Sequence, residues 1–404
     1  MKIKCVLILL ILILVKFNTY SQWIGQTVTP QSWLLSVYFT DIDTGYTVGG
    51  WNNACVYKTV DSGVNWSYLY SDTSTSWYLD VFFDSPDTGY VIGGNGVIAK
   101  TMDGGTNWIH QISGTTASLT SISCPAKDTC FIVGSYYTSG SYSIILKTTN
   151  GGNSWQTIYN GAGSLNNIDF VNTNVGYVVG SQTLKTTDGG NSWIIKNNDY
   201  NIDVSFVNKD TGYTMAYIDT VRKTTDGGNT WTNIFTNCNE DFEAIQAINE
   251  NIVVVACSTW VSLRVLRTTD GGITWNVQQQ PGDQLGSNNL FFLDENNGWL
   301  VGHPESGIHS IYKTSNGGNV TSVNSYPNSN NAVLVYPNPV HDIVNTNIND
   351  CEAIEIDDVW GKRLFYKEKP DKNFFLNITE YNQGIYFIKF TLKSSTKIEK
   401  ILKL

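Results

Sequence analysis

Apolar and polar residues alternate over short runs through most of the chain, and each run ends at a turn-forming segment. At 81–94, VFFDSPDTGYVIGG places aromatic and β-branched residues on both sides of a polar turn that contains glycine. This pattern is typical of two antiparallel strands joined by a tight turn. Related segments begin at positions 37, 81, 122, 168, 204, 245 and 290, so the chain predicts seven such hairpins.

A second segment follows each hairpin. Its best-kept copies read KTTDGGNSW at 185–193, KTTDGGNTW at 223–231 and RTTDGGITW at 267–275. Four variants start at positions 58, 100, 147 and 313, and the copies recur at intervals of 38–47 residues. Residues before the two glycines and residues from the tryptophan onward each predict a strand, which makes four strands per repeat. Four short strands every 40 or so residues indicate the blade of a β-propeller.

The acidic position of this segment could have a structural or a chemical role. It falls at Asp61, Asp103, Asn150, Asp188, Asp226, Asp270 and Asn316. An aspartate accepts hydrogen bonds from turn amides two residues on, and the glycines reach positive φ at little cost. Asparagine can cap a turn in the same way but cannot act as a carboxylate base. We therefore interpret the segment as a structural clip for the hairpin.

The two segments together, F-x-D-x-x-x-G-Y-x-V-G and K-T-x-D-G-G-x-x-W, resemble the Asp-box (BNR) repeats of sialidases, sortilin and photosystem II assembly factors. The resemblance spans residues 23–320 and is strongest to the assembly-factor subgroup, which implies a seven-bladed propeller. It also implies that the clips lie at the outer rim, away from the ligand face. The resemblance extends to a propeller that holds a partner protein, and not to a photosynthetic function.

The two ends of the repeat region complement each other. The last clip ends NGGNV and lacks the tryptophan that the six others carry, whereas QWIGQTV at 22–28 looks like a post-clip strand without its clip. We therefore expect residues 23–28 to form the outer strand of the seventh blade, with Trp23 as its tryptophan. Such an exchange would leave no open sheet edge between the first and last blades.

Composition agrees with an exported all-β protein. Aromatic residues make up 13% and charged residues 15% of the chain, a balance that favours strands and turns. A basic MKIK followed by VLILLILILV at 6–15 indicates a signal peptide cleaved after Ser21, and this run is too short to span a bilayer. Residues 22–330 hold 12 Lys+Arg and 25 Asp+Glu, a net charge of −13, which argues against nucleic acid as a partner.

A polar linker at 321–332 precedes a different region, 333–404. Its alternating strands and glycine turns predict a small C-terminal β-sandwich, so the fold class is all-β, a seven-bladed propeller at 22–320 followed by the sandwich. The order of YPNP, I-x-D-x-x-G-K and GIYFIKF resembles the C-terminal sorting domain of the type IX secretion system of Bacteroidetes. The resemblance implies Sec export, passage through the type IX machinery as partner of residues 333–404, and a final location in the medium or on the outer cell surface. A sandwich module of unrelated function is the alternative.

Six cysteines remain beyond the signal peptide. Cys124 and Cys130 flank the first turn of the third repeat, and Cys238 and Cys257 lie at adjoining ends of two strands of the sixth. Both pairs are disulfide candidates in an oxidising compartment. Their spacing matches no metal site, and we expect neither a metal nor a cofactor.

A ligand is expected on the face opposite the clips, where loops join the second and third strands and the successive blades. Aromatic side chains there could stack on sugars or peptides, and the candidate contacts are Trp51, Trp77, Tyr136, Tyr137, Trp260 and His303. The same face is expected to carry Tyr78, Tyr217, Glu240, Asp241, Glu243 and Glu305. Ordinary packing is the alternative role for several of the aromatic residues, and a solvated loop is the alternative for the acids.

These features favour a secreted or cell-surface protein that binds a glycan or a protein without catalysis. The alternative is a glycosidase that uses two loop carboxylates, although nothing in the sequence pairs them. A sialidase is disfavoured because it needs clustered arginines, whereas the propeller region holds only Arg222, Arg264 and Arg267. No H-E-x-x-H or G-x-S-x-G motif supports a metallo- or serine hydrolase.

Overall fold

A computed structural model describes residues 23–137, 141–216, 220–234, 238, 241–259, 262–278, 285–304, 309–318, 334–336, 343–347, 351–359, 361–371, 373–393 and 396–403. Contacts divide the chain into two units, residues 20–319 on the one hand and residues 1–19 with 320–404 on the other. The predicted signal peptide lies outside the described residues. Within the described ranges, no helix has the length and apolar character needed to cross a membrane.

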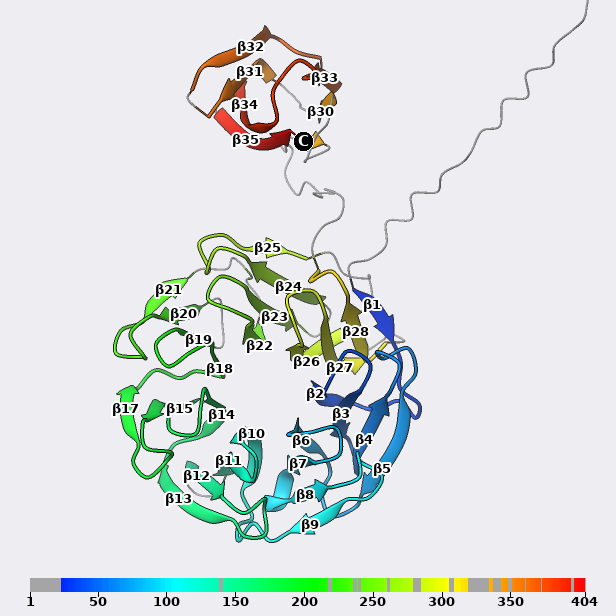
Figure 1. Cartoon of the computed structure of the whole chain (residues 1–404), viewed down its shortest axis with the longest axis vertical. Helices are drawn as coiled ribbons and strands as arrows, with labels where there is room; N and C mark the ends of the chain where they lie inside the picture. The colour runs from blue at the N-terminus through cyan, green and yellow to red at the C-terminus, as the bar shows by residue number, and fades with distance from the viewer. Residues whose placement is uncertain are drawn as a thin grey trace, which may run out of the picture. The chain divides into compact units, whose positions relative to one another are not determined.

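The unit of residues 20–319 is a ring of seven four-stranded antiparallel sheets, the blades (Figure 1). In blades 1 to 6 the strands run in chain order from the axis to the rim. Blades 1 to 3 are β2 (Leu34–Phe39), β3 (Gly45–Gly50), β4 (Ala54–Thr59), β5 (Ser67–Asp72); β6 (Tyr78–Phe83), β7 (Gly89–Gly93), β8 (Ile98–Thr101), β9 (Ile109–Gln111); and β10 (Ser118–Ala126), β11 (Thr129–Tyr137), β12 (Ser141–Thr148), β13 (Gln156–Ala162). Blades 4 to 6 are β14 (Leu165–Phe170), β15 (Gly176–Gly180), β16 (Thr183–Thr186), β17 (Ile194–Asn197); β18 (Asp203–Phe206), β19 (Gly212–Met215), β20 (Val221–Thr224), β21 (Thr232–Ile234); and β22 (Asp241–Ala247), β23 (Val253–Thr259), β24 (Ser262–Thr268), β25 (Asn276–Val277). A short 3-10 turn, η1 (Gly94–Gly96), joins β7 to β8.

An aromatic residue that covers a glycine shapes the first hairpin of most blades. Phe39 is the register partner of Gly45 across β2 and β3, and a Cβ atom on this glycine would collide with the Phe39 ring. The same phenylalanine–glycine pair recurs in blades 2, 4, 5 and 7. This packing explains why the second strand of the repeat starts with glycine.

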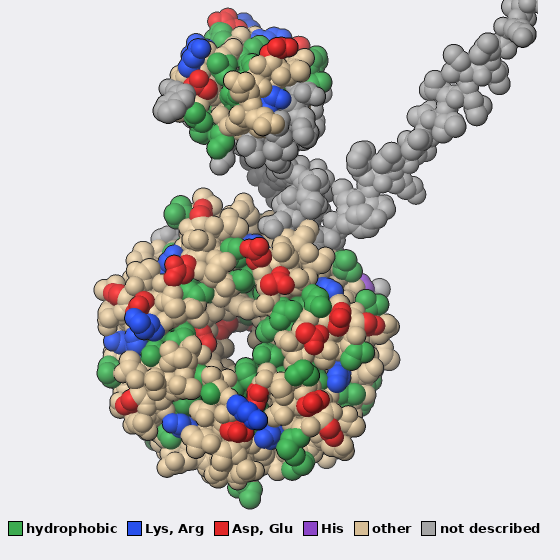
Figure 2. All heavy atoms as spheres, viewed as in Figure 1, with side chains coloured by type: hydrophobic (Ala, Val, Ile, Leu, Met, Phe, Trp, Pro, Cys, Tyr) green, Lys and Arg blue, Asp and Glu red, His purple; other side chains and the backbone are tan. Residues whose placement is uncertain are grey.

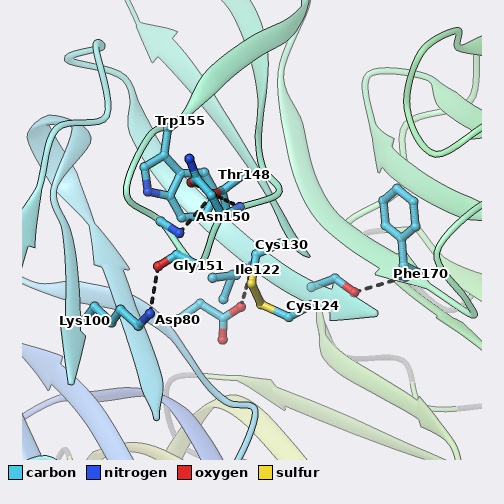
Figure 3. The surroundings of a disulfide bond; sticks show 12 residues. Asp80, Lys100, Ile122, Cys124, Cys130, Thr148, Asn150, Gly151, Trp155 and Phe170 are labelled. Carbon is cyan, nitrogen blue, oxygen red and sulfur yellow. Dashed lines mark hydrogen bonds between the residues drawn. A yellow bond between two sulfur atoms is a disulfide. The ribbon is translucent and has the colours of Figure 1, made fainter. Parts of the chain in front are cut away.

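A disulfide stands at this position in blade 3. Cys124 and Cys130 are bonded across β10 and β11 (Figure 3). A second disulfide joins Cys238, which precedes β22, to Cys257 in β23. Both bonds link the pairs that the sequence marked as candidates. The other two described cysteines, Cys55 and Cys351, are free.

Stacked aromatic rings pack neighbouring blades against each other. Phe170 of blade 4 stacks on Phe131 of blade 3 with ring centroids 3.8 Å apart, and Phe206 of blade 5 stacks on Tyr177 of blade 4 at 3.4 Å. The clip tryptophan meets the same phenylalanine edge to face, as in the pair Trp193–Phe170 at 6.1 Å. The repeated aromatic positions therefore bury each sheet against the next one.

Blade 7 has the predicted exchange between the chain ends. Its strands are β26 (Leu285–Phe292), β27 (Gly298–Pro304), β28 (Ile311–Thr314) and, outermost, β1 (Ile24–Gln26). Trp23 is 1% exposed, and its ring lies edge to face with Phe292 at 5.9 Å, as the clip tryptophan does in blade 4. The Trp23 indole N–H donates to Gln278 Oε1 at 3.0 Å. The first described strand thus closes the ring.

Side-chain hydrogen bonds link the inner strands of all seven blades around the axis. Each bond joins one blade to the next, and in most of them a side-chain oxygen accepts from a backbone N–H; Figure 3 shows the bond from Ile122 to Asp80. In order around the ring the pairs are Ser36–Asp80, Asp80–Ile122, Ser123–Phe170, Asp169–Phe206, Asp203–Ile245, Gln246–Phe292 and Asn288–Leu34.

The lysine of the clip forms a second set of links, at the rim. Lys100 Nζ donates to the carbonyl oxygen of Gly151 in the next blade at 2.7 Å (Figure 3). The same Nζ atom lies 5.3 Å from the ring centroid of Tyr90 in its own blade. Four more blades repeat this bond, in the pairs Lys58–Gly104, Lys147–Gly189, Lys185–Gly227 and Lys223–Gly271. Arg267 takes the same role toward Gly317 at 2.8 Å. The positively charged residue that recurs in the clips therefore links each of these blades to the next one by a hydrogen bond.

The second unit contains two antiparallel sheets. One has β29 (Leu334–Tyr336), β30 (Ile343–Asn347) and β33 (Asn373–Asn377), and the other has β32 (Arg363–Glu368), β31 (Cys351–Asp358), β34 (Gly384–Leu392) and β35 (Thr396–Lys403). Buried residues of both sheets form one apolar cluster, with Val344 and Leu376 from the first sheet and Ile356 and Ile388 from the second. A shared core between two sheets is what the predicted sandwich requires.

Candidate ligand-binding face

The strand order gives the propeller two faces. Loops between the first and second strands and between the third and fourth strands, which include the clips, lie on the clip face. Loops between the second and third strands and between successive blades lie on the loop face. Antiparallel strands produce this separation because successive turns fall at opposite ends of a sheet.

On the clip face, each acidic group of the repeat is occupied within its own turn. The Oδ1 atom of Asp188 accepts hydrogen bonds from Thr186 Oγ1 at 2.8 Å and from the Ser192 N–H at 2.9 Å, and its Oδ2 atom accepts from Ser192 Oγ at 2.6 Å. The hydrogen bonds from Ser192, with that from Thr186, lower the pKa of Asp188 to about 2. A carboxylate held in this way is a weak base and suits a structural turn.

The other six repeats form the same bond from the threonine two residues earlier. It reaches an aspartate carboxylate or an asparagine amide oxygen alike, and the acceptors are Asp61, Asp103, Asn150, Asp226, Asp270 and Asn316. The bond to asparagine agrees with the structural interpretation of the clip.

On the loop face, an aromatic cluster lies where blades 7 and 1 meet. Trp51 follows β3, and its ring centroid is 4.2 Å from that of Trp33, which precedes β2. The Trp33 ring lies 4.8 Å from that of His303 in β27. Trp51 nevertheless remains 55% exposed. A large exposed ring that other rings hold in place can stack on a ligand at a low cost in conformational entropy.

Trp77 lies in the neighbouring loop, between blades 1 and 2. Its backbone forms an isolated bridge with Gly50, the residue before Trp51, and its side chain is 37% exposed. Trp33 was missed in the sequence, although SWLLSVYF at 32–39 and SWYLDVFF at 76–83 place Trp33 and Trp77 at the same position of their repeats. We call Trp33, Trp51, Trp77 and His303 the loop-face aromatic residues.

The remaining aromatic candidates are less informative. Tyr136, in β11, is partly buried, and its hydroxyl is hydrogen-bonded to that of Thr115. Tyr137 ends the same strand, and its side chain lies outside the described part of the structure. Trp260 also lies outside the described residues, together with Tyr217, Glu240 and Glu305.

The prediction that Tyr78 lies on the loop face as a loop residue was wrong. Tyr78 is the first residue of the inner strand β6, is fully buried, and belongs to the apolar cluster between blades 1 and 2. Its hydroxyl donates to Asp72 Oδ2 at 2.6 Å, which satisfies its one polar group. Polar residues precede Tyr78 in the sequence, but its place in an inner strand between two blades buries the side chain.

Two acids of the loop face, Asp241 and Glu243, lie at the start of β22. Ser258 Oγ donates to Glu243 Oε1 at 3.2 Å, and burial raises the pKa of Glu243 to about 7. A carboxyl group that titrates near neutral pH can donate a proton in general acid catalysis. Among the described residues, no group of three or more His, Cys, Asp or Glu side chains could hold a metal ion.

A channel of about 250 Å³ runs along the axis between the inner strands. Figure 2 shows it as a hole in the wheel with acidic side chains at its wall. The acids that line it are Asp80, Asp169 and Asp203, and no clip residue does so. Burial raises the pKa of Asp80 and of Asp169 to about 6 and that of Asp203 to about 7.

Comparison with family models gives two matches. Residues 334–403 match the secretion system C-terminal sorting domain, and residues 66–162 match the photosynthesis system II assembly factor YCF48. The propeller is therefore similar to YCF48 over part of its length, and the C-terminal region is similar to the type IX sorting domain. No curated protein matches it significantly.

Solved structures agree with the propeller fold. A structure of YCF48 bound to D1 peptide is 18% identical, with a TM-score of 0.60 over 73% of this chain and 97% of that chain. YCF48 from Cyanidioschyzon merolae is 17% identical, with a TM-score of 0.58 over 74% and 99% of the two chains. An ancestral GH74 enzyme is 13% identical, with a TM-score of 0.56 over 93% of this chain and 62% of that chain. At these identities the likeness shows the fold alone.

The sorting domain decides where the YCF48-like propeller acts. It directs the protein through the type IX secretion machinery to the cell surface or the extracellular space, as the sequence predicted. The conditions outside the cell are also those in which disulfides persist, in agreement with the two that the propeller contains.

Proposed function

We propose that this YCF48-like propeller is a non-catalytic binding protein that holds a glycan or a protein ligand outside the cell through its loop face. The observation that carries the proposal is the exposed Trp51 ring, which packs on Trp33, whose ring in turn packs on His303. Trp77, in the loop between blades 1 and 2, adds a second exposed tryptophan whose backbone bridges the residue before Trp51. A propeller of similar fold, YCF48, has been solved with a bound peptide, which supports a role in holding a partner.

The clip face is the weaker candidate for this role. Its polar groups bond to one another within each turn, so a ligand would compete with hydrogen bonds that already exist. Its turns are also repeated around the wheel, whereas the loop-face aromatic residues occur at one place. A single ligand needs a surface that differs from its neighbours, and the loop face provides it.

The proposal is tested with the mature chain, residues 22–404, on glycan and peptide arrays, followed by titration of the ligand found. Trp51→Ala and Trp77→Ala should each weaken binding at least tenfold, because large aromatic anchors dominate such contacts. The matched control is Ile273→Ala, which removes an 84% exposed apolar side chain from the clip face. Its affinity should equal that of the parent protein. Equal affinity of both tryptophan variants and the parent would contradict the proposal.

A second candidate function is glycoside hydrolysis, and one observation favours it. Glu243 titrates near neutral pH, as a general acid should, and Asp241 precedes it by two residues. Assays with chromogenic glycosides measure hydrolysis directly. Turnover by the parent protein that Glu243→Gln abolishes, with ligand binding retained, would replace the binding function by an enzymatic one. No turnover on any glycoside that the propeller binds would rule the second candidate out.

A further inference from the structure

One layer of the central channel collects an equivalent residue from each inner strand. The strand registers align Tyr38 with Tyr46, Phe82 with Tyr90 and Asp169 with Tyr177, one position before the phenylalanine that covers a glycine. The same position in all seven blades lines the channel. In order from blade 7 the layer consists of Phe291, Tyr38, Phe82, Ser123, Asp169, Ser205 and Gln246.

Three of the seven residues of this layer form an aromatic wall. The Tyr38 ring lies between Phe82, at a centroid distance of 5.1 Å, and Phe291, at 5.0 Å. The wall therefore extends without interruption across blades 7, 1 and 2. The Tyr38 hydroxyl has no hydrogen-bond partner among the described residues, and burial raises its pKa to about 12, so it stays neutral at physiological pH.

A carboxylate stands across the channel from this wall. Asp169 belongs to blade 4, three blades from Tyr38, which is the largest separation that a ring of seven allows. Its Oδ2 atom accepts a hydrogen bond from the Phe206 N–H at 2.6 Å. Its Oδ1 atom accepts none from any described residue, so one oxygen of this lining carboxylate remains available.

The negative charge of the channel is not balanced by any basic residue among the described lining residues. Asp80 and Asp203 also line it, and both oxygens of each are bonded to backbone N–H groups or to the Ser36 hydroxyl. None of the described lining residues is basic. Three carboxylates confined by protein and without a cation create a negative potential that favours a positively charged guest.

We propose that the central channel binds a small organic cation, an alkylammonium group of the kind found in polyamines and lysine side chains, between the Phe291–Tyr38–Phe82 wall and Asp169. The aromatic faces attract the cation through their quadrupoles, and Asp169 Oδ1 accepts a charge-assisted hydrogen bond from its N–H groups. The volume of about 250 Å³ accommodates an alkyl chain with its ammonium group. A neutral sugar would leave the carboxylates uncompensated. This site is separate from the loop-face aromatic residues and does not depend on the proposed function.

The test is calorimetric titration of the full mature chain with 1,4-diaminobutane at pH 8. Saturable binding is expected, and 1,4-butanediol, which has the same length without charge, should not bind. Asp169→Asn should weaken binding at least tenfold, because the amide keeps an acceptor for the Phe206 N–H but removes the negative charge. Tyr38→Leu should weaken it severalfold through loss of the central ring. The control is Asp210→Asn, an exposed acid in a turn on the clip face, which should bind as the parent does.

The pH dependence gives an independent readout. Titratable groups reach the lining from β6, β14, β18 and β2, as Asp80, Asp169, Asp203 and Tyr38, and the inner strands of blades 3, 6 and 7 contribute none. Since the pKa of Asp169 is about 6, binding should weaken markedly between pH 8 and pH 5 as this carboxyl is protonated. Equal binding of diamine and diol, unchanged affinity in both Asp169→Asn and Tyr38→Leu, or binding of Ca²⁺ alone would overturn the proposal.

Discussion

The two faces of the propeller are made from the same seven sheets, yet they differ in how far they repeat. On the clip face, one turn with one pattern of hydrogen bonds recurs in every blade. On the loop face, blade 1 presents Trp51 and blade 2 has the 3-10 turn Gly94–Gly96. Blade 6 has the Cys238–Cys257 disulfide near this face. Every sheet needs the same turn, whereas one ligand needs one surface. Repetition in this chain therefore marks scaffold, and departure from repetition marks candidate function.

The largest effect on stability is expected in blade 7, where Trp23 from the N-terminal region supplies the tryptophan that the last clip lacks. Trp23→Ala should lower the free energy of unfolding by about 3–5 kcal/mol, because the indole is buried against Phe292 and donates to Gln278. Deletion of residues 22–28 should destabilise the propeller further, since it removes β1 as well. Denaturant unfolding measures both. A deletion variant with the melting temperature of the parent would disprove closure by exchange.

Each face of the propeller has one disulfide nearby, so the stability that each covalent link contributes can be compared. Cys238 and Cys257 are 19 residues apart, and Cys124 and Cys130, at a turn of the clip face, are 6 apart. Loop-closure entropy then predicts losses of about 3 kcal/mol for Cys238→Ser with Cys257→Ser and about 2 kcal/mol for Cys124→Ser with Cys130→Ser. Thermal unfolding of the two double variants shows which disulfide contributes more to stability. The reverse order would mean that packing around the cysteines outweighs chain entropy.

The channel between the faces should make stability depend on pH. Burial raises the native pKa of Asp80, Asp169 and Asp203 above the unfolded value, so the native state holds protons that the unfolded chain has released between about pH 4 and pH 7. Stability should therefore fall as the pH rises from 5 to 8, by on the order of 1–3 kcal/mol. Asp169→Asn removes one of these groups and should flatten the profile. A parent protein that becomes more stable toward pH 8 would contradict this account.

A smaller effect is expected from one clip. Asp188→Ala should lower the melting temperature slightly, because it removes the acceptor of the turn hydrogen bonds from Thr186 and Ser192. Asp188→Asn should melt at the same temperature as the parent, since Asn150 and Asn316 accept the same bond in their own turns. Melting temperatures compare the two variants. An asparagine variant as unstable as the alanine variant would show that the charge itself is needed.

The smallest effect on stability is expected at Trp51. Trp51→Ala should change the free energy of unfolding by less than about 0.5 kcal/mol because the side chain is mostly exposed, although the same change should weaken ligand binding at least tenfold. Trp23 and Trp51 thus separate scaffold from candidate site within one residue type. A loss of stability at Trp51 close to that at Trp23 would assign the loop-face cluster to packing.

Much of the scaffold was predictable because its signals are local and repeated. A period of about 40 residues with four strand-like runs predicts a blade, and the missing seventh tryptophan identified Trp23 as the closing residue. The site was less predictable. Trp33 was overlooked, Tyr78 was misplaced, and the lysine of the clip was not recognised as a link between blades. Each of these depends on a neighbour in another blade, and spacing within one repeat carries no such information.

The amino-acid sequence by itself determined the blade count, the clip turns, the closing strand and the address carried by the sorting domain. These follow from hydrogen bonds and side-chain periods that act over a few residues, or from a pattern repeated often enough to be read without coordinates. Only the tertiary structure decided which side chains meet at the axis and on the loop face. The aromatic wall at Tyr38 and the carboxylate of Asp169 belong to strands more than 100 positions apart, and closing the ring is what brings them into one channel.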